Sequence, residues 1–228
     1  MEMSRSTLSQ DEIDRADAYL KITEGDVEAL QKMLKNLDSK SPVHLLTLSR
    51  LALFKGLADA AMMAFDRAWE INPHEFSLSQ ANQYIQLALA AKQTVKAHSI
   101  TKNLNHRYPY KYGNTNNFCY LSLLLGMEPT QVLDQIHSII RAVPNNPAFL
   151  STLALANLLS GNPEQALKDM QMRSTPQLIH SERVLLAVIF YQLEEKERAE
   201  KMAATVPHQR LLPEELKLLQ DHNLVVAQ

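Results

Sequence analysis

Residues 42–75, PVHLLTLSRLALFKGLADAAMMAFDRAWEINPHE, decide the fold of this chain. Two apolar stretches with helical spacing stand on either side of Gly56, which ends the first helix, and the second stretch closes at Pro73. The residues that define the two apolar faces are Leu45, Leu48 and Ala52, then Ala61, Phe65 and Ala68. Because alanine at a crossing lets two helix axes approach closely, the stretch predicts a helical hairpin.

The hairpin is one unit of a repeat. Prolines recur about every 34 residues, each after a helix-like apolar stretch. They are Pro42, Pro73, Pro109, Pro144, Pro176 and Pro207. Only five glycines and an aromatic share of 6% leave little material for strands and hairpin turns. The sequence therefore predicts an all-α chain of stacked two-helix units, each of which buries its apolar face against its neighbours.

The spacing of Gly56, Ala61, Phe65, Ala68 and Pro73 resembles the tetratricopeptide repeat (TPR) family, which places Gly, Ala, an aromatic residue, Ala and Pro likewise. Residues 147–180 resemble it in the same register. The resemblance implies one right-handed α-solenoid over residues 1–228, with five to six hairpins and a C-terminal capping helix. The implied units are 9–41, 42–75, 78–111, 113–146, 147–180 and 180–212, followed by the capping helix 213–222.

The turn inside each hairpin is where the units differ. Gly56 and Gly161 stand at the usual glycine position, whereas Lys92 and Glu194 replace it in their units. Gly126 falls one place early in the unit 113–146. The repeat register is retained, while the residues that mark it vary.

No signature of catalysis or cofactor binding occurs in the sequence. It has no Gly-x-Ser-x-Gly elbow, no Gly-rich phosphate loop and no His-Glu-x-x-His pair. Cys119 is the only cysteine, which excludes an internal disulfide and a thiolate metal cluster. We therefore expect a protein that is not an enzyme and has no cofactor or metal. We also expect a cytoplasmic protein without a membrane partner, since no run approaches the ~20 apolar residues of a membrane span.

Partner-binding residues are implied by the resemblance, because the first helix of each TPR hairpin lines the concave groove. Transferred to this chain, the polar groove positions are Arg50, Asn82, Gln86, Asn114 and Asn117, followed by Leu121 and the later apolar positions Leu155, Val184 and Val188. Asn and Gln each donate and accept hydrogen bonds, so this ladder could hold an extended peptide backbone. The alternative is that the amides only satisfy helix ends and neighbouring groups.

Residues 107–117, RYPYKYGNTNN, are predicted to form a loop, being too rich in Pro, Gly and Asn to continue a helix. Tyr110 and Tyr112 are candidate binding anchors in it, since tyrosine combines a large contact area with a polar group. The alternative is that these rings only hold the loop against the array.

The leading hypothesis is a non-catalytic scaffold or adaptor that binds a peptide or helix of another protein in its groove. RNA binding is an alternative, because residues 76–127 contain no Asp or Glu but five basic residues, within a net charge of −2. A second alternative is a homodimer that pairs apolar ends through residues 224–227, LVVA.

Overall fold

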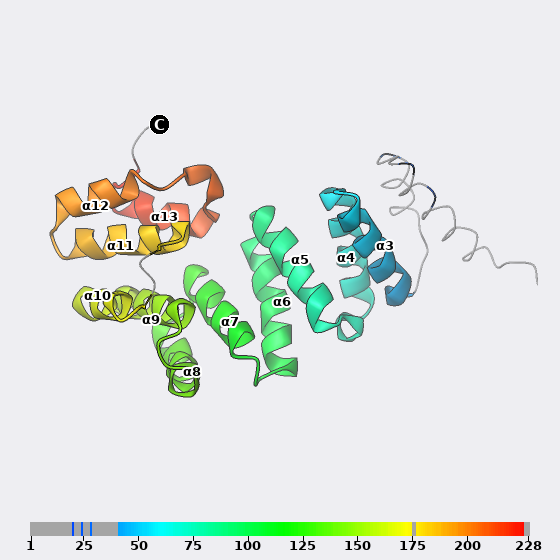
Figure 1. Ribbon diagram of the computed structural model, residues 1–228, viewed down its shortest axis with the longest axis horizontal. Coiled ribbons are helices and arrows are strands. Elements are labelled where there is room, and N and C mark those ends of the chain that lie inside the picture. The colour runs from blue at the N-terminus through cyan, green and yellow to red at the C-terminus, as the bar shows by residue number, and fades with distance from the viewer. Residues whose placement is uncertain (1–19, 21–23, 25–27, 29–40, 175–176, 226–228) are drawn as a thin grey trace, which may run out of the picture. The chain divides into compact units, whose positions relative to one another are not determined.

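The computed structural model describes residues 20, 24, 28, 41–174 and 177–225, which form helices joined by short connections (Figure 1). Within these residues there is no strand, so the all-α prediction is confirmed. The predicted unit 9–41 lies outside the described residues apart from Leu20, Glu24, Glu28 and Ser41. The chain divides into two compact units, one ending at Ala88 and one beginning at Leu89.

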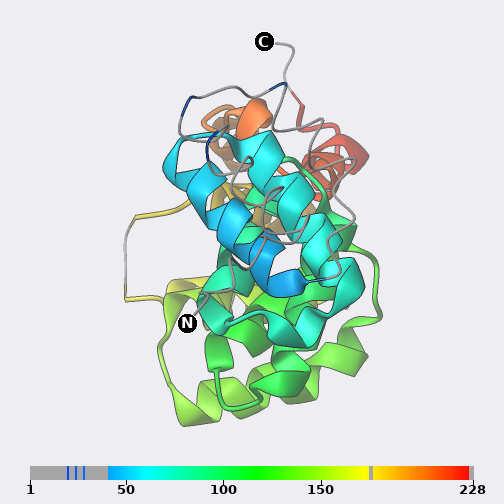
Figure 2. The same ribbon diagram turned by 90° about the vertical axis from the view of Figure 1, so that its right-hand side faces the viewer.

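The first unit contains the hairpin on which the sequence analysis rests. Its elements are α3 (Pro42–Phe54), α4 (Ala58–Ile71), the short 3-10 helix η1 (Pro73–Glu75) and most of α5 (Leu78–Ala90). Helices α3 and α4 pack side by side, as Figures 1 and 2 both show. The predicted hairpin 42–75 is therefore present, with both helices where the apolar spacing places them.

Four aromatic rings join α4 to α5 in this unit. Phe65 and Trp69 come from α4, Phe76 follows η1, and Tyr84 lies on α5. The centroids of neighbouring rings are 5.0 to 5.9 Å apart, within the range in which aromatic pairs attract. The Tyr84 hydroxyl donates a hydrogen bond to Asp66, so its polar end is satisfied although the ring is buried.

A substitution at Ala61 tests whether α3 and α4 pack closely. Its side chain has no exposed surface, so Ala61→Leu inserts three carbons into a filled crossing. We expect the variant to lose about 1–3 kcal/mol of unfolding free energy in urea denaturation. Ala58→Leu is the control, because Ala58 is exposed on the same helix. Equal stabilities for the two variants would contradict close packing at Ala61.

The second unit continues the alternation of helices. Its elements are α6 (Thr94–Arg107), α7 (Tyr112–Leu124), α8 (Pro129–Ala142), α9 (Pro147–Leu159), α10 (Pro163–Gln171), α11 (His180–Gln192), α12 (Lys196–Ala203), the 3-10 helix η2 (His208–Arg210) and α13 (Pro213–Asp221). Below, α3, α5, α7, α9 and α11 are called first helices, and α4, α6, α8, α10 and α12 second helices. Each first helix has 13 residues.

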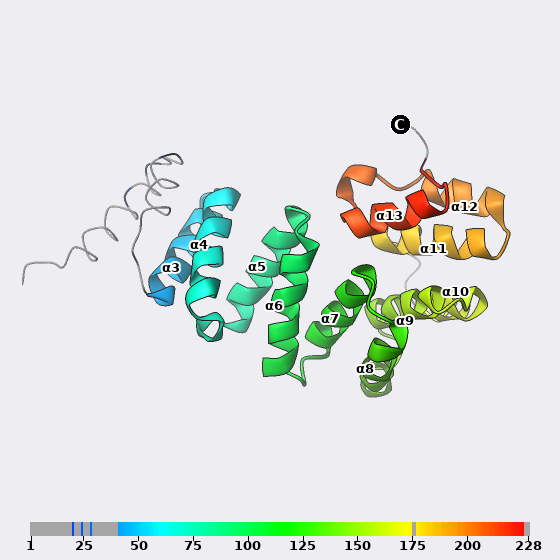
Figure 3. The ribbon, with the colours of Figure 1, turned by 180° about the vertical axis from the view of Figure 1, so that it is seen from behind.

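Helix α9 lies at the centre of the second unit. It packs against α7, α8, α10 and α11, and every residue from Phe149 to Ala156 is buried. This explains why its sequence is apolar on nearly all sides instead of along one stripe. Helix α13, the predicted capping helix, packs on α11 (Figure 3).

A left-handed residue follows each first helix, two positions after its end. The φ angles are 75° at Gly56, 57° at Lys92, 83° at Gly126, 77° at Gly161 and 64° at Glu194. In the α9 and α11 turns, the next amide N–H bonds back to a carbonyl of the last helical turn, at 2.9 Å in both. Lys92 and Glu194 thus adopt the conformation that glycine adopts elsewhere, at a steric cost that glycine lacks.

We predict opposite effects at two equivalent turns. Glu194→Gly should raise the unfolding free energy, because it removes left-handed strain, and Gly161→Ala should lower it, each by about 1 kcal/mol. The loss expected for Gly161→Ala does not come from a steric clash, since a Cβ at Gly161 would meet no atom within 4 Å. Urea midpoints that moved the other way would contradict this explanation of the turns.

The predicted loop 107–117 is wrong in its second half. Helix α6 ends at Arg107 and α7 begins at Tyr112, so the connection comprises only residues 108–111. Glycine and asparagine are tolerated here because they occupy the first turn and a half of α7, where part of the backbone has no partner within the helix. The α7 hairpin therefore begins at residue 112 instead of 113, and Gly126 is in register with the other turns.

Candidate functional site

The one-residue shift of α7 changes which side chains occupy the groove positions. Counting from the predicted start of each first helix, the residues predicted for the groove, apart from Asn114, are the fifth and ninth. In α5 these are Asn82 and Gln86, as predicted, whereas in α7 they are Asn116 and Tyr120. The predicted residues Asn114 and Leu121 lie in the interior instead, with exposed fractions of 8% and 3%.

In the first unit, a shallow hollow of about 790 Å³ lies along α5 and the end of α3. It is lined by Leu53, Leu78, Ser79, Asn82, Gln83, Gln86 and Leu87. Asn82 and Gln86 are both exposed, so their amides are available to a ligand. Arg50 is exposed on α3 but is not among the lining residues.

In the second unit, a narrower pocket of about 190 Å³ lies between α7, α9, α11 and α13, and we call it the α13 pocket. Its polar lining residues are Asn116, Asn117, Tyr120, Ser151, Thr152, Ser181, Glu182 and Glu215; its apolar ones are Leu124, Ala148, Leu155, Ile179, Val184, Leu185 and Leu218. Fifth and ninth residues of first helices are thus part of its wall. The predicted Asn117 is exposed and lines it too.

Glu182 is one of two buried carboxylates in the α13 pocket. It accepts a hydrogen bond from the backbone N–H of Ile179 at 2.9 Å, which satisfies a free donor at the start of α11. Its other oxygen accepts from the Ser151 hydroxyl at 2.9 Å and lies 2.8 Å from the Arg173 guanidinium. The Glu182 charge is therefore compensated inside the protein.

Glu215 is the other buried carboxylate, with 6% of its surface exposed. It accepts hydrogen bonds from the Tyr120 hydroxyl at 2.5 Å and from the Leu212 backbone N–H at 2.8 Å. No ion pair joins Glu215 to a basic side chain among the described residues. Burial raises the pKa of this carboxyl above its ordinary value of 4.5, while the bond from Tyr120 opposes the rise.

Tyr120 stays protonated beside this carboxylate, because burial and then the Glu215 charge raise the pKa of its phenol well above 10.0. Helix α13 is thereby tied to α7, and a second bond ties it to α6, from the Thr94 hydroxyl to Glu214 at 2.7 Å. The capping helix therefore closes one side of the pocket through polar contacts to helices about a hundred residues earlier in the chain.

Asn116 presents a buried acceptor in the α13 pocket. Its side chain is 7% exposed, and among the described residues its Oδ1 has no hydrogen-bond partner. A buried amide oxygen without a partner destabilises a protein unless a ligand or water satisfies it. Asn116 is a lining residue of the α13 pocket, so a ligand that reaches this buried oxygen would satisfy it.

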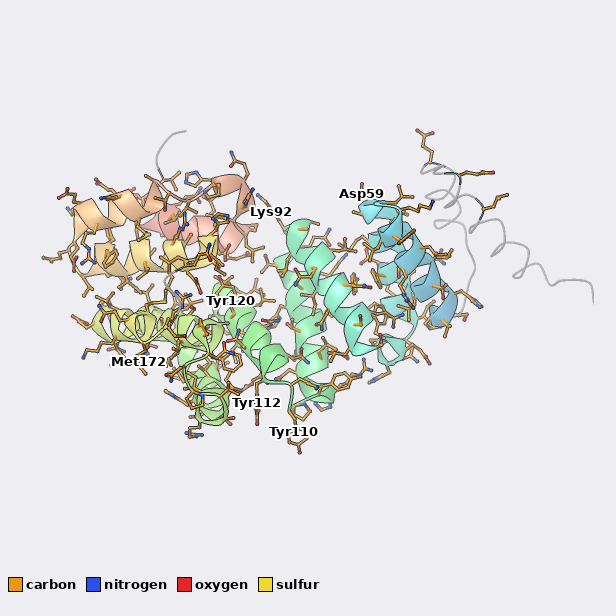
Figure 4. All side chains as sticks on the ribbon, viewed as in Figure 1. Asp59, Lys92, Tyr110, Tyr112, Tyr120 and Met172 are labelled. Atoms are coloured by element: carbon orange, nitrogen blue, oxygen red, sulfur yellow. The ribbon has the colours of Figure 1, made fainter. Side chains whose placement is uncertain are left out.

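The two candidate tyrosine anchors lie at the α6–α7 connection, as Figure 4 shows. Tyr110 is 86% exposed, and Tyr112 is half-buried as the first residue of α7. Arg107 stacks on the neighbouring Tyr108, with its guanidinium carbon 5.2 Å from the ring centre. Tyr110 is thus exposed enough to contact a partner, whereas Tyr112 presents only part of its ring.

Other reactive groups do not form a site in the part of the chain that the structure describes. No three His, Cys, Asp or Glu side chains there gather as metal ligands. The Cys119 thiol is buried, and burial raises its pKa to about 12, so it stays protonated and a poor nucleophile. None of the described helices combines the length and apolar character needed to cross a membrane.

Sequence reasoning missed Asn116, Tyr120, Glu182 and Glu215. The shift of Gly126 was the available signal for the first two, because it shows that this hairpin begins one residue earlier. Glutamate at the third helical position was a signal that Glu182 and Glu215 cap helix starts. Their common pocket had no such signal, since it depends on contacts between distant helices.

No family model matches the sequence, and no curated protein matches it. Solved structures do match. TTC0263, a thermophilic TPR protein of Thermus thermophilus, is 20% identical with a TM-score of 0.51, over 80% of this chain and 97% of its own. A TPR protein of Parabacteroides merdae is 15% identical with a TM-score of 0.49, over 93% and 98%. PilW, a type IV pilus biogenesis factor, is 19% identical with a TM-score of 0.47, over 93% and 100%.

We predict that Glu215 makes stability fall as pH rises. The pKa of Glu215 is raised in the folded state, so the stability that its proton contributes is complete below the ordinary pKa of 4.5 and is lost as pH rises through the folded pKa. Glu215→Gln should therefore lose less stability than the wild type over that window, measured by urea denaturation at each pH.

Tyr120→Phe provides the opposite change. It removes the hydrogen bond that lowers the pKa of Glu215, so the loss of stability should extend to higher pH than in the wild type. Identical pH profiles for the wild type and both variants would show that Glu215 is not the responsible group.

Together, the α-helical hairpins, the left-handed turn after each first helix and the match to TTC0263 show that this chain has a TPR-like repeat fold.

Proposed function

We propose that the protein is a non-catalytic interaction module that binds a segment of another protein on the outer faces of its first helices. One observation carries this proposal. In each unit, a hollow is lined by fifth and ninth residues of first helices, Asn82 and Gln86 in one unit and Asn116, Tyr120, Ser151 and Leu155 in the other. The two units are built from the same repeat, and in each the hollow lies at the same positions of the first helices.

The chemistry of these faces suits a peptide. Exposed amides at Asn82, Gln83 and Gln86 can pair with a peptide backbone whatever its side chains, because each amide both donates and accepts. The α13 pocket is deeper and has apolar walls, so it suits a single anchoring side chain. Tyr110 adds an exposed aromatic contact at the α6–α7 connection.

The acid-free segment 76–127 supports RNA binding less well. Lys92, Lys102 and Lys111 are exposed, but the α13 pocket contains two glutamates and no basic side chain. A site of that charge repels phosphate. For the homodimer alternative, Leu224 is 3% exposed and Val225 is 38% exposed, while residues 226–227 lie outside the described residues.

The test is crosslinked capture of partners from a host lysate by the full chain and two triple variants. The first variant carries Asn82→Glu, Gln86→Glu and Asn117→Glu, all exposed on first helices. The control carries Ser99→Glu, Gln131→Glu and Ser138→Glu, which add the same charge on exposed positions of second helices.

We expect a protein captured by the wild type and the control to be lost from the first variant, with both variants folded by circular dichroism. Bulky charge at exposed first-helix positions blocks close docking but leaves the core intact. Capture that survives in the first variant and fails in the control would place the binding surface on the second helices. Recovery of RNA in place of a protein would favour the alternative function.

A further inference from the structure

We propose that the α13 pocket receives a lysine side chain of the bound partner, with the ammonium among its acceptor groups and the aliphatic stem against its apolar walls. This inference rests on the proposed function and adds the chemistry of the anchoring residue. It follows from the charge of the pocket, from its unpaired acceptor and from the composition of its walls.

The charge of the pocket is negative, and an ion pair compensates it only at Glu182. Two glutamates line it and no Lys, Arg or His does. Arg173 neutralises Glu182, but Glu215 is only 6% exposed and receives two hydrogen bonds from neutral donors. A buried carboxylate without a counter-ion favours a cationic ligand strongly, because that ligand replaces the missing compensation.

His180, at the start of α11, is a basic side chain whose charge acts on Glu215, but no ion pair joins the two in the part of the chain that the structure describes. Its Nε2 lies 3.4 Å from the Arg210 guanidinium. Arg210 itself is exposed to solvent and does not line the pocket. The Glu215 charge is therefore available to a ligand.

Acceptor oxygens of two pocket residues have unused hydrogen-bonding capacity. Asn116 Oδ1 is buried and unpaired among the described residues, and the Glu215 oxygens each accept one hydrogen bond while having room for a second. An ammonium has three donors and no acceptor, so it can satisfy these oxygens together. A purely apolar side chain would leave Asn116 unpaired and remove water from Glu215, which makes it a poor occupant.

The apolar walls match the rest of a lysine. Leu124, Leu155 and Leu218 come from α7, α9 and α13, and α11 with the residue before it contributes Ile179, Val184 and Leu185. Long charged side chains pack their methylene stems on such surfaces while the charged end meets polar groups. The pocket volume of about 190 Å³ is also far more than the roughly 10–15 Å³ that one water needs.

The experiment is an NMR titration of the isotope-labelled full chain with Nα-acetyl-lysine-N-methylamide. The norleucine analogue has the same stem without the ammonium, and the arginine analogue carries a planar cation. We expect the lysine probe to shift signals of Asn116, Tyr120, Ser181 and Glu215 at millimolar concentration, and to bind about tenfold more tightly than norleucine.

Two variants and a control test the assigned groups. Glu215→Gln and Asn116→Ala should each weaken lysine binding several-fold, and Glu200→Gln should not, because Glu200 is exposed on α12 and is outside the pocket lining. Asn116→Ala guards against misfolding, since it removes an oxygen that bonds no described residue. Thermal unfolding of each variant verifies the fold.

Equal binding of lysine and norleucine would show an apolar pocket and overturn the inference, as would tighter binding of arginine or no shift of these signals. Such a result with a partner still lost from the first-helix variant would leave the proposed function intact. Lysine binding together with a partner retained by that variant would instead contradict the proposed function alone.

Discussion

Close contact between helices at buried alanines is the constraint on which this structure depends. Ala61, Ala64 and Ala68 of α4 have no exposed surface, and Ala154, Ala166 and Ala187 are equally buried in the second unit. A larger side chain at such a crossing would push the helix axes apart. Because the alanines are on the faces between helices, each first helix keeps its remaining face for other contacts.

The α13 pocket is a consequence of that arrangement together with the return of the C-terminal helix. Helices α7, α9 and α11 present their groove positions on one side, and α13 is held there by Tyr120–Glu215 and Thr94–Glu214. Two carboxylates that begin as local helix caps thus become the polar part of a pocket. The same glutamates stabilise helix starts and belong to the proposed binding pocket, so in the proposed function stability and recognition depend on the same residues.

Much of the fold was predictable from local sequence, because a helical repeat depends on contacts between neighbours in the chain. The hairpin 42–75 and the helix start at Pro147 follow from apolar spacing, proline and capping residues. The start of α7 was mispredicted because Tyr-Gly-Asn is typical of a loop. The first turn of a helix accepts the same residues, so the pattern does not distinguish the two. The early position of Gly126 is explained by the start of α7 at Tyr112, which the structure shows.

The candidate site was predictable in part. Asn82 and Gln86 lie on an exposed face because their helix was placed correctly, whereas Leu121 inherited the register error and is buried. Asn114 is buried as well. The pairing of Glu215 with Tyr120 spans 95 positions in the sequence. Neither residue has a local pattern that names the other, so only the packed structure brings them together. The single domain over 1–228 stays a prediction, and each unit is described by itself.

Site-specific photo-crosslinking in living cells tests the central claim most directly. A benzophenone amino acid would replace Gln86 or Asn117 on first helices, and Ser99 or Ser138 on second helices, all of them exposed positions. The account predicts crosslinks to one protein partner from Gln86 and Asn117 and none from Ser99 and Ser138. Crosslinks from the second-helix positions alone would contradict it, because the partner would then bind the opposite set of helices.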